Sequence, residues 1–190
     1  MKIIEIPSSR LDEYARIPIF FQVKSIFEIL LINNGLGGIK LKERNVATYE
    51  KDYDSYGSPL SWSVEFDLHN WGIFLGIENG KAVGGAAVAR DTNGLHMLEG
   101  RKDMTVLWDL RVLPEMRRMG IGRKLFEFAV GWSKSKGCTQ MKIETQNINV
   151  NACRFYAAMG AKLGDIRRFA YQEQATVSHE VQLNWYINLR

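Results

Sequence analysis

The sequence predicts a mixed α/β fold, and three observations support that prediction. Asn79-Gly80 separates two apolar segments, and this dipeptide favours the two-residue turn of a β-hairpin. Segment 105–112 is apolar, predicts a strand and leads through a glycine-containing turn into an amphipathic helix. Strand, helix, strand, helix and strand then follow the hairpin, an order typical of a sheet packed against helices.

Upstream of the hairpin, the pattern predicts a first strand over 2–6 and a short helix over about 8–16. Either of the two serines at the start of this helix can cap it, because a serine hydroxyl accepts a hydrogen bond from a free backbone N–H. Residues 20–32 are apolar and β-branched enough to form a strand in part. The glycine-rich segment 33–38 is interpreted as a plain turn.

Segment 41–67 is polar and aromatic, and its acidic residues outnumber its basic ones. The acidic residues are Glu43, Glu50, Asp52, Asp54, Glu65 and Asp67, against Lys42, Arg44 and Lys51. Two interpretations stay open: an acidic surface that receives a cation, or a solvated loop or helix face. For a cationic substrate, this segment is the first candidate binding site.

The hairpin strands are expected at 71–78 and 81–90, and a polar connection follows over 91–103. The helix after the glycine-containing turn ends near Lys136-Gly137. Its apolar face comprises Ile121, Leu125, Phe128, Ala129 and Trp132. The remaining predicted elements are a strand over 140–145, a helix over 151–159 and a terminal strand over 181–189.

The composition fits one domain over residues 1–190. Hydrophobic residues make up 46% of the chain, which is enough for a sizeable core, and no repeat or linker is evident. The start of the chain lacks the apolar segment of a signal peptide, and no apolar run approaches the roughly 18 residues of a membrane span. We therefore expect a single cytoplasmic domain that does not bind membranes.

The charged residues, cysteines and histidines argue against two kinds of partner. The net charge is +4, but outside 117–124 and the pair Arg167-Arg168 the basic residues are interspersed with acidic ones, so we expect no nucleic-acid binding. The two cysteines and three histidines lack metal-ligand spacing, so we expect no metal site. The sequence leaves open whether the chain forms a homodimer.

The turn after strand 105–112 is a candidate anion-binding site. Gly120 and Gly122 let the backbone turn tightly and approach a ligand, so that successive N–H groups can point inward. The first amides of the following helix lack partners, and its dipole adds positive potential. The basic side chains that reinforce this potential are Arg117, Arg118, Arg123 and Lys124. The sequence therefore predicts a pyrophosphate site.

Two common phosphate-binding loops do not match this turn. A dinucleotide fingerprint needs a third glycine where the chain has Leu125, and a P-loop needs Gly-Lys followed by Ser or Thr. The turn instead resembles the Arg/Gln-x-x-Gly-x-Gly/Ala motif of the GNAT N-acetyltransferase superfamily, carried here by Arg117, Gly120 and Gly122. A basic turn with ordinary glycines is the alternative interpretation.

A second segment resembles a later motif of the same superfamily. Residues 149–161 are similar to N-x-x-A-x-x-[FL]-Y-x-x-x-G-F, with Asn149, Tyr156 and Gly160 in place and Ala161 where Phe is usual. The same segment is also a short amphipathic helix that ends at glycine, which agrees with the motif. On these two motifs in the correct order, the chain is identified as a member of the superfamily.

Within the superfamily, the chain is most similar in detail to the streptothricin acetyltransferases, which acetylate an amine of a cationic antibiotic. The segments that carry this resemblance are 144–147, 152–156 and 184–187, and 46–53 has a comparable aromatic and acidic order. The net basic charge does not favour attraction of a polycation, although a local acidic pocket would suffice. Antibiotic resistance is thus one role that the resemblance implies.

The resemblance implies a central twisted mixed β-sheet with helices on both faces, and acetyl-coenzyme A as the cofactor. Two central strands would splay apart to admit the acyl arm, and a backbone N–H near Val112 would stabilise the oxyanion. The residues expected to bind the cofactor are Leu110, Arg111, Val112, Arg117, Arg118, Met119, Gly120, Ile121, Gly122, Arg123, Asn149 and Tyr156.

An amine acceptor needs a group that removes its proton. A primary amine with a pKa of about 10.4 is almost fully charged at pH 7 and cannot attack a thioester in that form. Asp109 and Glu144 lie on successive predicted strands and are the candidate general bases, directly or through water; we favour Glu144. The alternative for each is a structural acid paired with Arg or Lys, and for Asp109 we prefer that alternative.

Tyr156 matches the family tyrosine that meets the departing sulfur. Proton transfer from a phenol to a thiolate is uphill by roughly 2 kcal/mol, so we expect Tyr156 chiefly to hydrogen-bond the thiolate. A packed helix tyrosine is the alternative. Asn149 is expected to contact the pantetheine or pyrophosphate arm, whereas Asn147 and Asn151 are interpreted as simple caps.

Three functions fit these features. The first, which we favour, is acetylation of a small-molecule amine. The second is a protein or peptide N-acetyltransferase, which needs a groove for a peptide. The third is a non-catalytic acyl-CoA sensor, against which the presence of Tyr156 and two candidate bases argues.

Overall fold

The computed structural model describes all 190 residues, and the chain divides into two compact units. Unit 1 comprises residues 1–20, 52–143 and 186–190, and unit 2 comprises residues 21–51 and 144–185. The sequence predicts one domain over 1–190. Two strands, β7 (Gln140–Gln146) and β9 (Gln182–Asn188), each continue from one unit into the other.

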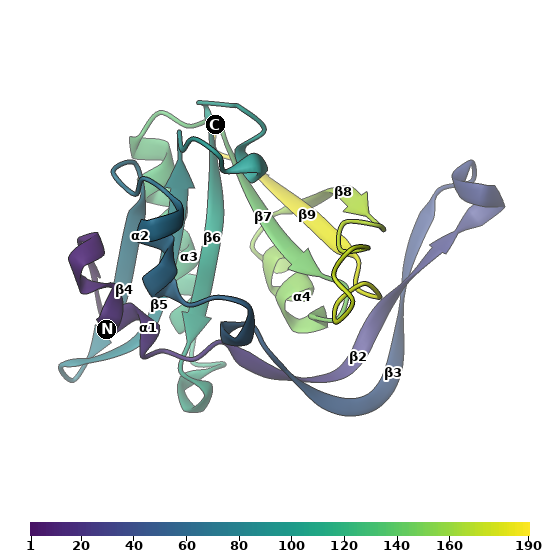
Figure 1. Cartoon of the computed structure of the whole chain (residues 1–190), viewed down its shortest axis with the longest axis horizontal. Helices are drawn as coiled ribbons and strands as arrows, with labels where there is room; N and C mark the ends of the chain where they lie inside the picture. The colour runs from purple at the N-terminus through teal and green to yellow at the C-terminus, as the bar shows by residue number, and fades with distance from the viewer. The chain divides into compact units, whose positions relative to one another are not determined.

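Unit 1 is built on a mixed sheet with the strand order β1-β4-β5-β6-β7 (Figure 1). The first four of these strands pair antiparallel, whereas β6 and β7 pair in parallel. The elements other than β7 are β1 (Lys2–Glu5), α1 (Leu11–Ala15), α2 (Trp62–Glu65), β4 (Gly72–Glu78), β5 (Lys81–Arg90), β6 (Met104–Val112) and α3 (Ile121–Ser135). The predicted mixed sheet is confirmed.

Helices cover both faces of the unit 1 sheet. A Cβ built on Gly84 would lie 2.9 Å from a methyl carbon of Leu125 on α3, whereas a Cβ on Gly85 would lie 2.4 Å from the ring of Tyr14 on α1. Because successive residues of a strand point to opposite faces, α1 and α3 lie on opposite sides of β5. Figure 1 shows α3 behind the strands of this unit and α2 in front of them. The predicted fold class is therefore confirmed.

Helix α3 buries one side against the sheet. The buried residues are Ile121, Leu125, Phe126, Ala129 and Ser133. Three of the five predicted residues, Ile121, Leu125 and Ala129, are among them. The other two are less buried: Trp132 is half-buried, and Phe128 is 40% exposed and touches Phe74 edge-on with ring centroids 5.0 Å apart. No helix in the structure is both long and apolar enough to cross a membrane, and α3 itself has 15 residues.

The opposite face carries an aromatic core. Tyr14 packs edge-on against Trp62, and Trp62 lies against Trp71, with ring centroids 5.4 and 5.9 Å apart. All three side chains are buried, and burying an apolar side chain of this size contributes about 2 to 3 kcal/mol. This core fixes α1 and α2 over the sheet.

The hairpin prediction is confirmed, and the capping prediction is wrong. Asn79 and Gly80 both have positive φ, and Glu78 pairs with Lys81 across the turn. At the N-terminus, a 3-10 helix over Ser8–Arg10 precedes α1, and its N-cap is Pro7 without a side-chain hydrogen bond. Proline fixes the extended entry to the first turn here, so no serine cap forms.

Unit 2 contains a two-stranded ribbon of β2 and β3, and the neighbouring strands β7, β9 and β8 in that order. These strands and the helix of this unit have the bounds β2 (Phe20–Leu31), β3 (Ile39–Asp52), α4 (Val150–Ala158) and β8 (Lys162–Arg167). The turn predicted at 33–38 is confirmed, with Asn33 and Asn34 at positive φ.

The sequence did not predict β3 or β8. Strand β3 is exposed along almost its whole length, so its polar residues give no period-two pattern. Strand β8 is short and contains glycine and aspartate, which are depleted in strands. Both strands form because neighbouring β2 and β9 supply backbone partners.

Candidate functional site

The predicted anion loop lies in unit 1, between β6 and α3. Gly120 is the N-cap of α3, has φ of 80°, and offers no side chain to the free helix amides. Arg118 also has positive φ, 68°, a conformation that costs a non-glycine residue about 1 kcal/mol. Two left-handed residues just before a helix start are typical of a backbone that turns its N–H groups toward an anion.

One charged side chain of this loop binds the backbone of β6, and the other basic side chains are exposed. Arg117 Nε donates to the Val112 carbonyl at 3.1 Å, and burial lowers the pKa of Arg117, an effect that Glu115 opposes. Arg118, Met119 and Gly120 are exposed, as are Arg123 and Lys124 in the first turn of α3. Arg117 thus holds the loop to β6, and the exposed basic groups face solvent at the helix start.

Strand β6 changes its pairing just before this loop. Ala87 pairs with Asp109 and Val88 pairs with Leu107, so Trp108 is an extra residue in β6, a β-bulge. The pairs between β6 and β7 end at Leu107 and Ile143. The bulge thus lies where the parallel pairing stops.

Beyond the bulge, alternate residues of β6 turn their backbone away from β5. Leu113 N–H donates to the Val83 carbonyl at 3.0 Å, and Val112 pairs opposite Gly84. Because backbone bonds alternate along an antiparallel pair, Leu110 and Val112 direct their N–H and C=O groups to the other edge of β6. These two residues have the orientation expected for binding an extended amide ligand.

Asp109 and Arg111 form a buried ion pair. Arg111 donates to both carboxylate oxygens of Asp109, at 2.9 and 2.7 Å, and also to Asp54 and the Ile17 carbonyl. The Tyr14 hydroxyl donates to Asp109 at 2.6 Å. Burial acts to lower the pKa of Arg111, but the hydrogen bonds and charge of Asp109 outweigh it and hold that pKa above its usual range.

This network assigns structural tasks to two residues of the predicted site. Asp109 already holds three donor groups and a full counter-charge, which supports the structural alternative over a general base. The Arg111 side chain is 2% exposed, and backbone alternation directs its N–H and C=O toward β5. The geometry therefore gives Arg111 the task of anchoring β6 to α1 and residue 54.

The second predicted carboxylate, Glu144, lies in unit 2 and has a different environment. Oε1 accepts hydrogen bonds from Gln146 Nε2, at 3.0 Å, and from the Tyr171 hydroxyl. Oε2 accepts from Gln182 Nε2. All three donors are neutral, and no Lys or Arg pairs with Glu144.

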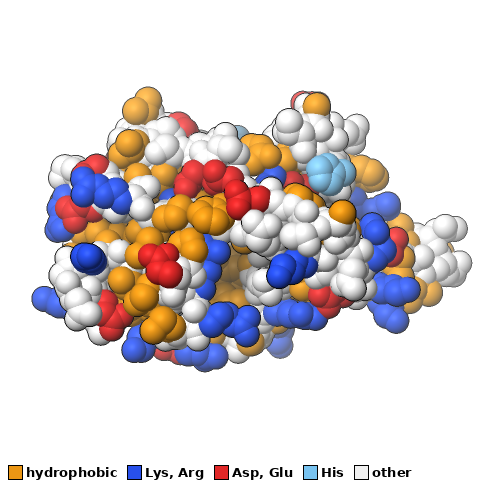
Figure 2. Space-filling model, turned by 90° about the horizontal axis from the view of Figure 1, so that it is seen from below, with side chains coloured by type: hydrophobic (Ala, Val, Ile, Leu, Met, Phe, Trp, Pro, Cys, Tyr) orange, Lys and Arg blue, Asp and Glu red, His pale blue; other side chains and the backbone are white.

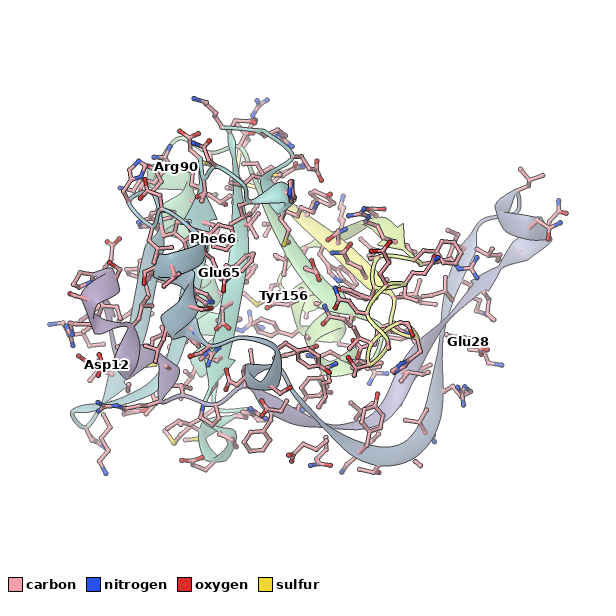
Figure 3. The ribbon with its side chains drawn as sticks, viewed as in Figure 1. Asp12, Glu28, Glu65, Phe66, Arg90 and Tyr156 are labelled. Carbon is pink, nitrogen blue, oxygen red and sulfur yellow. The ribbon has the colours of Figure 1, made fainter.

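Glu144 points to one face of β7, and the helix that carries Tyr156 packs on the other face. Thr145 points away from Glu144 and contacts Cys153 of α4 at 3.3 Å, so α4 packs on the Thr145 face. Tyr156 is on this helix, one turn after Cys153, and is 8% exposed (Figure 3). The two candidate catalytic side chains therefore serve opposite sides of one strand.

Asn149 caps α4, and Asn147 does not act as a cap. Asn149 accepts a hydrogen bond from Ala152 N–H at 3.1 Å. The prediction for Asn147 is wrong, because its side chain donates to the Phe27 carbonyl and accepts from Val181 N–H. Asn147 follows a strand end directly, and its amide completes the backbone bonding of two neighbouring segments.

The acidic segment 41–67 does not act as one element. Glu43 lies in unit 2 and pairs with Arg154, whereas Asp54 lies in unit 1 and pairs with Arg111. Asp67 pairs with His69 in unit 1, and its pKa is lowered by the hydrogen bonds from His69. On the face shown in Figure 2, acidic and basic side chains are likewise interspersed.

The sequence did not identify Tyr171 or Gln182. Tyr171 lies in the turn-rich segment between β8 and β9, which carries no motif. Gln182 begins β9, and only the pairing of β9 beside β7 brings it to Glu144. A strand of alternating polar residues, with Gln182 and Asn184 on one face, was the available signal.

Comparison with known proteins agrees with these features. A model of the acetyltransferase (GNAT) family matches residues 40–161. A streptothricin acetyltransferase of Escherichia coli is 31% identical over 166 residues, which cover 87% of this chain and 84% of that protein. Streptothricin acetyltransferase A of Bacillus subtilis is 26% identical over 145 residues, 76% of each chain.

A solved structure has the same fold. A candidate streptothricin acetyltransferase of Bacillus anthracis, crystallised in complex with acetyl coenzyme A, superposes with a TM-score of 0.78. The match covers 98% of each chain at 24% identity. At that identity the likeness concerns the fold.

Proposed function

Because this chain belongs to the acetyltransferase (GNAT) family and is an acetyl-CoA-dependent N-acetyltransferase, we propose that it acetylates a primary amine of a small cationic molecule, with streptothricin the first candidate. The observation that carries the proposal is the 31% identity to a streptothricin acetyltransferase over 87% of the chain. The uncompensated carboxylate of Glu144 supports an ammonium-bearing acceptor. Resistance to such an antibiotic would follow from the reaction.

The loop before α3 fits the pyrophosphate of acetyl-CoA, which supplies the acetyl group as an activated thioester. The uncapped amides of α3 and the exposed Arg118 and Arg123 would bind the phosphates. Leu110 and Val112 would pair with the pantetheine amides, and Val112 N–H could donate to the thioester oxygen. Met119, Ile121 and Gly122 complete the loop, and the free amide nitrogen of Asn149 would donate to the same ligand.

Glu144 would remove the proton from the acceptor amine. The donors to Glu144 are all neutral, so its carboxylate is not paired with a positive charge and can attract an ammonium group and accept one of its protons. Asp109 is excluded from our assignment because its charge is compensated by Arg111.

Tyr156 would donate a hydrogen bond to the departing sulfur. It is buried on the α4 side of β7, opposite the Glu144 face. If this role is right, Tyr156→Phe lowers kcat by about tenfold or more while the Kd for acetyl-CoA stays within about twofold. An unchanged kcat would remove Tyr156 from the mechanism.

The direct test is release of free coenzyme A from acetyl-CoA across streptothricin, aminoglycosides, polyamines and peptides. Selective turnover of streptothricin supports the proposal. Acetylation of peptides with a clear sequence preference, or tight binding of acetyl-CoA without turnover of any amine, would replace it with a peptide enzyme or an acyl-CoA sensor.

Gly120→Glu is the matched control for cofactor binding. The substitution puts a side chain at positive φ and a negative charge at the helix start, so acetyl-CoA binding should be lost. Nothing lies within 4 Å of a Cβ at this position, so folding should survive. Retained affinity for acetyl-CoA would contradict the loop assignment.

A further inference from the structure

We infer that Tyr171 and Gln182 are positioning residues for Glu144, and that they leave Oε2 of Glu144 as the atom that receives the acceptor's ammonium group. The inference rests on the proposed function, in which Glu144 takes a proton from the amine. It adds the residues that orient the carboxylate and the oxygen that meets the substrate.

The hydrogen bonds of Glu144 identify this oxygen. A carboxylate has about four acceptor sites, two on each oxygen. Gln146 and Tyr171 occupy both sites of Oε1, and Gln182 occupies one site of Oε2. One acceptor site therefore remains, on Oε2, and the three donors fix the direction in which it points.

The orientation of the Gln182 amide supports the same conclusion. Its Nε2 donates to Glu144, and its Oε1 is buried without any hydrogen-bond partner. A flip of the amide would place Oε1 against the carboxylate oxygen, so the donor orientation is held at the cost of an unsatisfied acceptor. The neighbouring Asn184 donates to Asp165 and likewise has a buried, unpartnered Oδ1. Both amides on this face of β9 thus direct their donor ends to carboxylates and leave their acceptor ends buried.

The segment that carries Tyr171 is held in place from both sides. Consecutive turns run through it, including Gln174 N–H to the Tyr171 carbonyl at 2.9 Å. At its far end, Glu180 pairs with Lys51 at 2.6 Å, and both side chains are buried. A phenol on such an anchored segment can fix a carboxylate without reorganisation when substrate arrives.

The proton transfer follows from this geometry. An N–H bond of the ammonium breaks, an O–H bond forms at Oε2, and the electron pair of the broken bond stays on nitrogen as the attacking lone pair. Because none of the three donors is charged, the negative charge of Glu144 is free to interact with the ammonium.

A double-mutant cycle tests the inference, with the best amine of the panel as acceptor. Introduced into the wild-type protein, Tyr171→Phe and Gln182→Met should each lower kcat by about tenfold, because each removes a hydrogen bond to a charged group. The KM for acetyl-CoA should stay unchanged. In the Glu144→Gln background, the same changes should have little further effect, because they act only through this carboxylate. Ser178→Ala removes a hydroxyl from the same segment away from Glu144 and should leave kcat unaltered.

The outcomes separate the inference from the proposed function. Equal losses in both backgrounds, or no loss in the wild type, would overturn the positioning role while leaving amine acetylation intact. If Glu144→Gln reduces the rate below detection, the cycle is read above pH 9, where more of the amine is neutral without a base. An enzyme that turns over no amine would overturn both.

Discussion

Two carboxylates on neighbouring strands, Asp109 on β6 and Glu144 on β7, show how similar residues acquire different tasks. Two nitrogens of the buried Arg111 guanidinium donate to the two carboxylate oxygens of Asp109, and the Asp109 side chain is 10% exposed. Glu144 is held by two amides and a phenol, none of them charged. Both carboxylates are well hydrogen-bonded, so the number of partners does not distinguish them. The charge of the partners does: a compensated carboxylate is a structural anchor, and an uncompensated one can bind a cation or a proton.

Among the variants of these two residues, Glu144→Gln should have the largest effect: it should lower kcat by about 10²- to 10⁴-fold, the usual contribution of a general base. The side chain keeps its size, and the Gln182 amide can flip so that its unpartnered Oε1 accepts from the new amide. Melting should therefore change little. A steady-state assay with the best amine, together with thermal unfolding, measures both. A kcat within about threefold of wild type would show that Glu144 is not the base.

Asp109→Asn should give the complementary result, loss of stability without loss of chemistry. Breaking a buried ion pair leaves Arg111 without its principal counter-charge, which costs about 3 to 5 kcal/mol. Asp54 still pairs with Arg111 at 3.1 Å, so the loss should fall at the lower end of that range. Denaturant unfolding measures the free-energy change, and kcat below the melting range should stay within about threefold. A stable variant with strongly reduced kcat would reverse the two assignments.

Ionisation of a buried thiol should have a smaller effect, a loss of stability at alkaline pH, which limits the pH range in which the two carboxylates can be compared. Burial raises the pKa of Cys153, beside Thr145, to about 11, against about 8.5 for a free thiol. The native state therefore binds this proton more tightly, and its stabilising contribution is complete below about pH 8.5 and lost as the pH rises to about 11. The loss should amount to about 3 kcal/mol.

Chemical denaturation at several alkaline pH values tests this expectation, with Cys153→Ala as the control. The variant should show a shallower decline of stability above pH 9, whatever its stability at neutral pH. Identical slopes for the variant and wild type would assign the alkaline loss to another group, such as the buried Tyr14, whose pKa burial also raises.

The sequence alone was sufficient to predict the order of elements from the hairpin to α4, the glycine turn before α3 and the family. These features depend on local rules: Asn79-Gly80 at positive φ, a helix start without a side-chain cap, and apolar spacing along α3. It also indicated both candidate carboxylates, because an acidic residue within an apolar strand can be recognised from the sequence alone.

The contacts of each carboxylate, in contrast, depend on the tertiary fold. Arg111 lies two residues from Asp109, yet Tyr14 and Asp54, the other members of that network, are distant in sequence. Tyr171 and Gln182 reach Glu144 only because β9 pairs beside β7 and Lys51 anchors Glu180. Strand β3 was missed for the same reason, since its polar residues are held by pairing with β2. Backbone pairing and side-chain charge neutralisation act between segments far apart in the chain, so neither leaves a periodic signal in the sequence.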